Sequence, residues 1–145
     1  MMQLQNTRTA VLVASAAAAT NADSTGYVDT KGFSEAQVSA VLGVAANATN
    51  IPTTLKLSES DDTEATNFSD FLVGGTTDGF KATAVSASTS IIVRANLDLR
   101  KRKRYIKGTF RAGTGTQLIT MVAVLGKAKD STLARASGAQ ASVDL

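Results

Sequence analysis

Residues 90–126 read SIIVRANLDLRKRKRYIKGTFRAGTGTQLITMVAVLG, and this stretch decides the fold class. Three segments in it, residues 90–97, 103–112 and 117–126, are rich in β-branched and other apolar residues and lack the 3.6-residue period of a helix. We expect each segment to form a β-strand. Gly113-Thr114-Gly115 separates the last two segments, so we expect them to pair as a β-hairpin.

Alternation along residues 103–112 divides that strand into two faces. One face is mostly apolar and would join the core: Arg104, Ile106, Gly108, Phe110 and Ala112. The other face would be a ladder of cations that includes one tyrosine: Lys103, Tyr105, Lys107, Thr109 and Arg111.

Earlier segments show the same period of two. Val38, Ala40, Leu42 and Val44 would point inward from a strand at residues 37–44. In a strand at residues 54–60, Leu55 and Leu57 would point inward, and Lys56 and Ser58 outward. Residues 8–14 suit a first strand or a short helix, residues 21–25 read as a loop, and residues 27–33 read as a bent connection in which Gly32 is free to adopt positive φ.

Turn-forming residues at intervals close to ten complete the pattern of an all-β protein. We expect an antiparallel β-sandwich or jelly-roll-like fold of seven to eight strands. Phe68, Phe71, Leu72 and Val73 would add bulk to the core, with one short helical turn near Phe68. The chain would be a single domain, residues 1–145, with an N-terminal arm and first strand at 1–25, a sandwich core at 26–127 and a C-terminal tail at 128–145. Both terminal arms are expected to be flexible.

The Ala-rich stretch at residues 10–19 has the outline of a signal peptide. Only Arg8 precedes it as a positive charge, and its apolar part is mainly alanine, so we do not expect a secretory signal. In a structural subunit, residues 1–19 would instead be an arm that orders by packing against a neighbour. No stretch approaches the ~18 apolar residues of a membrane span, and no membrane partner is expected.

The chain has no cysteine and no histidine. Thiolate nucleophiles, imidazole bases and zinc sites built from Cys or His ligands are therefore excluded. With two tyrosines and no tryptophan, the sequence also offers little from which to build a sugar-binding platform. We expect a protein that is not an enzyme and needs no cofactor.

Charge is divided unevenly along the chain. Residues 1–93 carry four basic and nine acidic side chains, whereas residues 94–145 carry eleven basic and three acidic ones. Such a division suits docking of acidic on basic surfaces between copies. We therefore expect interface residues in the basic region (Arg100, Lys101, Arg102, Lys103, Arg104, Tyr105, Lys107, Arg111) and in the acidic stretch (Glu59, Asp61, Asp62, Glu64).

Each of these two stretches has an alternative interpretation. The run Arg100–Arg104 could grip phosphates as a nucleic-acid-binding module, but Tyr105 is the only aromatic residue close to it in the sequence, so we do not expect nucleic acid as the main partner. The acidic stretch could ligate Ca²⁺, but its spacing matches no EF-hand. We expect it to be a solvated loop or the partner of the basic run.

Three segments of the chain carry a resemblance: residues 29–33 followed by a strand, residues 55–62, and residues 97–107. In this order they resemble small structural proteins encoded among the head genes of tailed bacteriophages. The resemblance implies a virion component, made in the host cytoplasm and located in the phage head. The role it favours is a capsid cement or decoration protein that binds the outer surface of the shell. Its partners would be the major capsid protein and further copies in a homo-oligomer, often a trimer. A head-tail connector or tail-associated structural subunit is the alternative.

Overall fold

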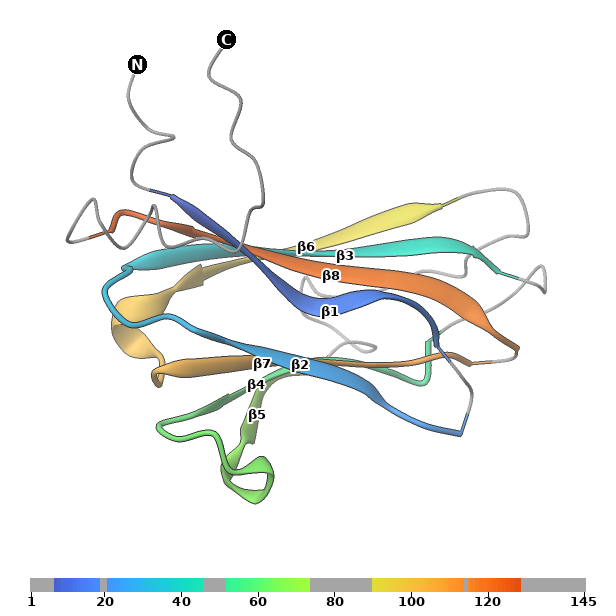
Figure 1. The fold of residues 1–145 in the computed structure, drawn as a ribbon, viewed down its shortest axis with the longest axis horizontal. Coiled ribbons are helices and arrows are strands. Elements are labelled where there is room, and N and C mark those ends of the chain that lie inside the picture. The colour runs from blue at the N-terminus through green and yellow to red at the C-terminus, as the bar shows by residue number, and fades with distance from the viewer. Residues whose placement is uncertain (1–6, 19–20, 46–51, 74–89, 114, 129–145) are drawn as a thin grey trace, which may run out of the picture.

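Two four-stranded antiparallel sheets face each other in the computed structural model, which describes residues 7–18, 21–45, 52–73, 90–113 and 115–128 (Figure 1). The first sheet has the strand order β1-β8-β3-β6, and the second sheet has the order β2-β7-β4-β5. The strands are β1 (Arg8–Ala18), β2 (Ser24–Asp29), β3 (Glu35–Ala45), β4 (Thr54–Ser60), β5 (Ser69–Val73), β6 (Ile91–Asp98), β7 (Tyr105–Arg111) and β8 (Gln117–Gly126). The predicted all-β antiparallel sandwich is therefore confirmed.

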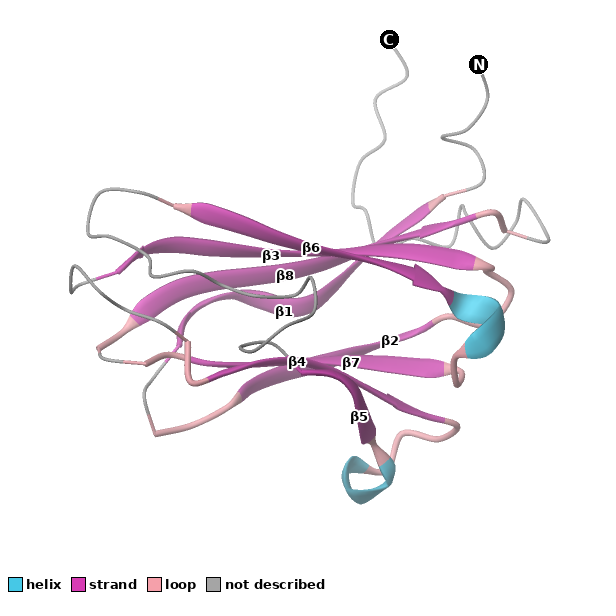
Figure 2. Cartoon of the chain, turned by 180° about the vertical axis from the view of Figure 1, so that it is seen from behind, coloured by secondary structure: helices cyan, strands magenta, loops and turns pink. Residues whose placement is uncertain are grey.

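Helical structure is short, as the sequence predicted. Figure 2 shows the two 3-10 helices of the described residues, η2 (Ala65–Asn67) and η3 (Leu99–Lys101). The first of them is the helical turn expected near Phe68, and the second was not expected. Neither is long or apolar enough to cross a membrane, and the described part of the chain contains no other helix.

The core lies between the two sheets, because alternation along each strand turns one face of each sheet inward. Val38, Ala40 and Leu42 of β3 are fully buried, as predicted from their spacing. The side chain of Val44 is outside the described part. The largest fully buried apolar side chains come from both sheets: Phe110, Leu42, Leu57, Ile106, Ile119, Met121 and Leu125.

One side of the sandwich is closed by the close approach of β1 and β2. Gly26 of β2 lies directly against the backbone of Leu12 in β1, and a Cβ placed there would overlap the Leu12 carbonyl group. Only glycine has no side chain to obstruct this contact. The absent Cβ lets the two sheets meet at this edge.

The last two strands do not form the predicted hairpin. β7 pairs with β2 and β4 in the second sheet, whereas β8 pairs with β1 and β3 in the first sheet. The connection at residues 112–116 therefore crosses from one sheet to the other. The prediction was wrong because the alternation of a strand shows only which of its residues face the core. The same alternation occurs whether the next strand pairs with it in one sheet or lies in the opposite sheet.

The N-terminal region confirms one prediction and corrects others. β1 confirms the strand alternative for residues 8–14 and extends it to Ala18. Because β1 pairs with β8 in the chain's own first sheet, residues 8–18 are not an arm that packs on a neighbour. Residues 24–29, expected to be partly loop and partly bent connection, form β2 and pair with β7. Gly32 does adopt positive φ, at 88°, in the turn that follows. Residues 1–6 of the predicted arm and residues 129–145 of the predicted tail lie outside the described residues.

Two polar residues predicted to point into solvent are buried. Ser58 is covered by β5, where its hydroxyl donates a hydrogen bond of 2.7 Å to Asp70 Oδ1. Thr109 lies on β7 between β2 and β4, and its register partners Thr25 and Lys56 flank it on both sides. The sequence pattern does not predict this burial, because these side chains are covered by neighbouring strands of the same sheet and not by the core.

Candidate functional site

The basic run Arg100–Arg104 does not lie on a strand. It occupies η3 and the loop that carries the chain from β6 in the first sheet to β7 in the second sheet. Asp98 caps η3, because its Oδ1 accepts a hydrogen bond of 3.1 Å from the backbone N–H of Arg100. The predicted strand start at Lys103 and the alternation of Lys103 and Arg104 are thus wrong, since β7 begins at Tyr105.

Thr30 fastens the end of this loop to β2. Its backbone N–H and its hydroxyl both donate to the carbonyl oxygen of Arg104, at 2.9 and 2.6 Å. Thr30 is buried, so this attachment is shielded from water. The loop therefore presents Arg104 beside β2 at a defined position.

Each arginine of the run forms an ion pair with a carboxylate of the same chain. Arg100 pairs with Asp98 at 2.8 Å, and Arg102 lies 3.6 Å from Glu59. Arg104 binds Asp29 through two nitrogens, Nε at 3.0 Å and Nη2 at 2.6 Å. Part of the acidic-on-basic pairing that the sequence predicts between copies is thus formed within one chain. The side chains of Lys101 and Lys103 are exposed and have no ion pair among the described residues.

These pairs set the charges at this end of the sandwich. The side-chain hydrogen bond from Arg100 lowers the pKa of Asp98 to about 2. The hydrogen bond from Arg104 is the main cause of the lowered pKa of Asp29, against a smaller opposing effect of burial. Both carboxylates are ionised at neutral pH, so they act as fixed charges and not as proton donors.

The acidic stretch divides into residues with different roles. Glu59 lies on β4, half-buried, and its Oε2 accepts a hydrogen bond of 3.2 Å from the backbone N–H of Lys103. Asp62 organises the loop before η2, because it accepts bonds from the backbone of Glu64 at 3.0 Å and from Asn67 Nδ2 at 2.9 Å. The bond from Asn67 is the main cause of its lowered pKa.

Asp61 and Glu64 point into solvent. No cluster of three or more carboxylates in the described residues could hold a metal ion, so the Ca²⁺ interpretation of the acidic stretch gains no support there.

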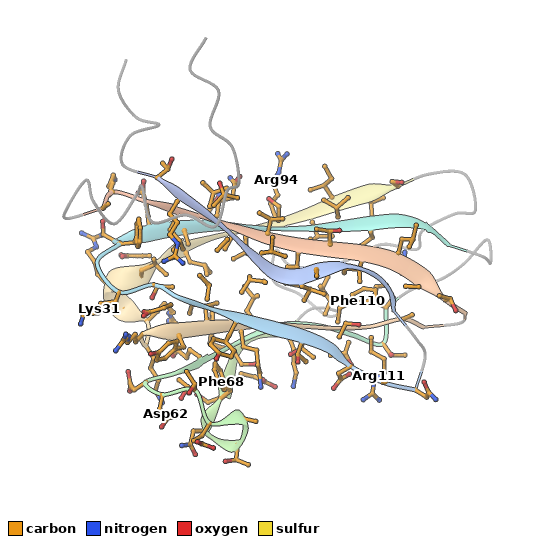
Figure 3. All side chains as sticks on the ribbon, viewed as in Figure 1. Lys31, Asp62, Phe68, Arg94, Phe110 and Arg111 are labelled. Atoms are coloured by element: carbon orange, nitrogen blue, oxygen red, sulfur yellow. The ribbon has the colours of Figure 1, made fainter. Side chains whose placement is uncertain are left out.

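Three aromatic rings gather on the outer face of the second sheet. Tyr27 on β2 lies with its ring centroid 6.0 Å from that of Tyr105 on β7, edge to face, and 6.1 Å from that of Phe68. Phe68 follows η2 directly, and Figure 3 shows its side chain below the second sheet, outside the core. The sequence prediction that residues 68 and 71–73 add to the core is therefore wrong for Phe68, whereas Phe71 does pack against the core.

Cations cover two of these rings. Lys107 Nζ lies 4.4 Å from the centroid of Phe68, and the guanidinium carbon of Arg104 lies 4.9 Å from the centroid of Tyr105. Both distances suit cation–π attraction. Tyr27 remains 50% exposed, which makes it the most exposed aromatic side chain among the described residues. We call Tyr27, Phe68, Arg104, Tyr105 and Lys107 the aromatic–basic face.

The remaining predicted site residue, Arg111, lies apart from this face. It follows Lys107 by two outward positions along β7 and pairs with Asp23 at 2.7 Å. The structure thus brings together Arg104, Tyr105 and Lys107 from the predicted set. It adds Tyr27 and Phe68, which sequence reasoning missed because they are distant in the chain. The register partner of Tyr27 is Lys107, and only strand pairing reveals this.

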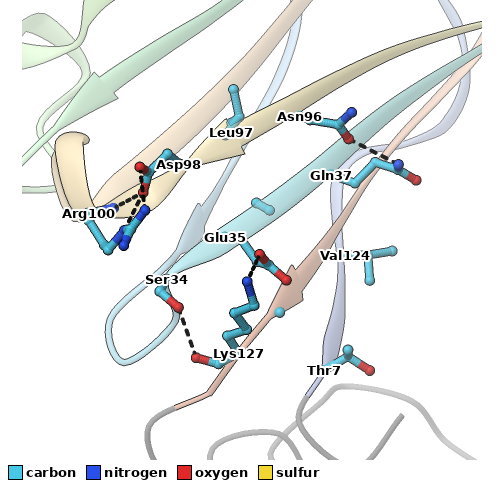
Figure 4. A pocket seen from close by; sticks show the side chains of 12 residues that line it. Thr7, Ser34, Glu35, Gln37, Asn96, Leu97, Asp98, Arg100, Val124 and Lys127 are labelled. Atoms are coloured by element: carbon cyan, nitrogen blue, oxygen red, sulfur yellow. Dashed lines mark hydrogen bonds and ion pairs between the residues drawn. The ribbon is translucent and has the colours of Figure 1, made fainter. Parts of the chain in front are cut away.

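A hollow of about 650 Å³ lies at one end of the first sheet, between β3, β6 and β8 (Figure 4). Its charged residues are paired: Lys127 with Glu35 at 2.9 Å, and Arg100 with Asp98. Gln37 donates to Asn96 at 3.1 Å within it. This hollow holds no unpaired acid or base of the kind that general acid–base chemistry needs.

Comparison with known proteins finds likeness only among solved structures. No family model matches the sequence, and the search of curated proteins finds no match. The chain is similar to the K3 adhesin domain of Lys-gingipain from Porphyromonas gingivalis, with 14% identity, a TM-score of 0.45 and coverage of 77% of this chain and 73% of that one. It is also similar to a chain of the infectious bursal disease virus structure, with 8% identity and a TM-score of 0.47, covering 82% of this chain and 31% of that one.

Proposed function

We propose that this chain is a structural subunit of a virus particle, a capsid cement or decoration protein of a tailed-phage head. It would be made in the host cytoplasm and would act by binding, without a catalytic step. The resemblance carried by residues 29–33, 55–62 and 97–107 supports the phage head as the location. In the structure these segments lie at or near the loop end of the second sheet, next to the aromatic–basic face.

The aromatic–basic face carries the proposal as the surface that binds the major capsid protein. Tyrosine and arginine are, with tryptophan, the residues most enriched among those that dominate binding energy in protein interfaces. Tyr27 offers a half-exposed ring that is already oriented by Tyr105 and Phe68, so little conformational freedom is lost when a partner covers it. Arg104 is held by Asp29 and Thr30, which fixes the rim of the same surface.

A cosedimentation assay with shells that lack this protein tests the proposal. Wild-type protein should pellet with the shells, and Tyr27→Ala should weaken binding by about 30-fold if Tyr27 behaves as a dominant interface residue. Arg111→Ala is the matched control, because Arg111 lies on the same outer surface of β7 but outside the aromatic–basic face. Absence of wild-type binding, or equal binding by Tyr27→Ala and wild type, would contradict the proposal.

Nucleic acid is the competing partner, and the ion pairs weigh against it. Arg100, Arg102 and Arg104 already contact carboxylates, which leaves Lys101 and Lys103 as the cations of the run without an ion pair in the described residues. Two phosphate contacts give only a shallow dependence of affinity on salt. A steep fall of duplex DNA affinity with salt, lost in a Lys101→Ala/Lys103→Ala variant, would favour the nucleic-acid function instead.

A further inference from the structure

The outer face of the first sheet carries exposed aliphatic side chains on all four of its strands, and it becomes polar at Gln37, Asn96 and Arg94. The most exposed large apolar side chains of the described residues, apart from Tyr27, lie there: Val11 (58%) on β1, Leu118 (57%) and Val124 (38%) on β8, Val41 (37%) on β3 and Ile92 (55%) on β6. We call these five residues the aliphatic face. Singly exposed apolar residues are ordinary, whereas a contiguous group of them on one surface marks a site of interaction.

Strand register shows that the group is contiguous. Val41 is the direct partner of Ile92 on one side and of Thr120 on the other, and Thr120 lies between Leu118 and Val122 along β8. Val11 is the partner of Val122, which in turn is paired with Ser39. The positions between the aliphatic residues are thus filled by Thr120, Ser39 and Val122, which carry no charge.

Charges lie at the margin of this face. Arg94 is on β6, the last strand of the first sheet, and its side chain points away from the second sheet (Figure 3). Glu35 starts β3 and is paired with Lys127 beyond the end of β8. The outer face of the second sheet is different, because Lys56–Asp70 and Arg104–Asp29 pairs lie across it. An apolar centre with a charged rim is the arrangement found in protein interfaces.

The size of the face is sufficient for a specific contact. Four strands about 4.8 Å apart and about 7 residues long at ~3.4 Å per residue give a surface of roughly 20 by 24 Å. Covering it removes roughly 500 Å² from each of two partners, or about 1,000 Å² in total, which reaches the lower bound of a specific protein interface.

We propose that the aliphatic face is the contact between two copies of this chain, packed sheet against sheet about a two-fold axis. The centre of the face carries no charge, so no partner of opposite charge is needed to cover it. Contact between two copies therefore buries no unpaired charge. Sheets pack face to face at about 10 Å, and Arg94 on the edge strand then remains in water at the rim. Because the same patch is used on both sides, the assembly closes at two copies. The aromatic–basic face remains free on the far side of each sandwich.

This inference goes beyond the proposed function and is tested without shells. Sedimentation of the full chain at micromolar concentration should give twice the mass of one chain. Leu118→Lys should give a single chain, since a lysine on the aliphatic face would be buried without an opposite charge in the contact. Tyr27→Lys, which changes a similarly exposed side chain on the opposite face, should leave the dimer intact. Circular dichroism and thermal melting show whether each variant is folded.

A second measurement does not depend on disrupting the contact. The chain has no cysteine, so a Val41→Cys variant carries a single thiol on the aliphatic face. A short bismaleimide should cross-link Val41→Cys into dimers and should leave a Tyr27→Cys variant as single chains. A wild-type monomer at all concentrations, a trimer, an oligomer unchanged by Leu118→Lys, or cross-linking of Tyr27→Cys in place of Val41→Cys would each overturn the inference.

Discussion

Gly26→Ala tests the close approach of β1 and β2 that closes one side of the sandwich. A Cβ at this position would lie 2.9 Å from the carbonyl carbon of Leu12 and would overlap the carbonyl oxygen. Carbon–carbon contacts are optimal at about 3.5–4.0 Å, so β2 must move outward by about 1 Å or more. The obstacle is backbone within a paired strand, which cannot rotate away as a side chain can.

The expected magnitude follows from two opposing effects. Overpacking of this kind costs about 1–3 kcal/mol and occasionally more, and here it also disturbs the pairing of Gly26 with Gly108. The reduced freedom of the unfolded chain returns about 0.4–1 kcal/mol when glycine is replaced by alanine. Because the obstacle is backbone, we expect a net loss in the upper part of the resulting range, about 1.5–2.5 kcal/mol, which corresponds to a fall in Tm of about 3–10 °C for a chain of this size.

Urea unfolding of Gly26→Ala beside Gly126→Ala is the assay. Gly126 is the matched control, because the atoms its Cβ would meet, at 3.0 and 3.1 Å, belong to the exposed and flexible Glu35 side chain. Gly126→Ala should stay within about 1 kcal/mol of wild type. Equal free energies of unfolding for the two variants would refute the close approach of β1 and β2 as described.

Two further predictions concern the core and the pH dependence of stability. Phe110→Ala removes a fully buried ring between the sheets and should lower the free energy of unfolding by about 3–5 kcal/mol in urea titrations; a loss below about 1 kcal/mol would contradict its burial. The lowered pKa values of Asp29 and Asp98 mean that their contribution to stability is present above the ordinary carboxyl pKa of 3.8 and is lost as pH falls through the lower folded-state values. Tm measured against pH should therefore fall below about pH 5, and the difference between wild type and Asp29→Asn should shrink toward about pH 2. A difference that is constant over this range would contradict the Asp29–Arg104 pair.

The local pattern of apolar residues was sufficient to locate the strands that bury one face in the core. Residues 117–126 were predicted with the bounds that β8 has, because Leu118–Leu125 is an almost continuous apolar run that ends at Gly126. β2 was missed because Gly26 and Asp29, which are depleted in strands, leave Tyr27 and Val28 as a strand signal only two residues long. Its strand conformation comes from pairing with β7, whose residues lie about eighty positions later.

The candidate site shows the same division. Arg104, Tyr105 and Lys107 stood out because they are adjacent in the sequence. Tyr27 and Phe68 did not, because strand pairing and the fold of η2 bring them to Lys107. The basic run looked like a free polycation, and the carboxylates that neutralise its arginines are Glu59, Asp29 and the neighbouring Asp98.

The amino-acid sequence by itself determined the all-β class, the inward face of most strands and the absence of imidazole and thiol chemistry, since these depend on residue type and on a period of two. Tertiary structure alone decided that β7 and β8 belong to opposite sheets and that Gly26 allows β1 and β2 to meet at one edge. It also decided which side chains form the aromatic–basic face and which form the aliphatic face. The physical reason is that alternation is a local property of each strand, whereas the partner of a strand is chosen by the burial that the whole chain achieves.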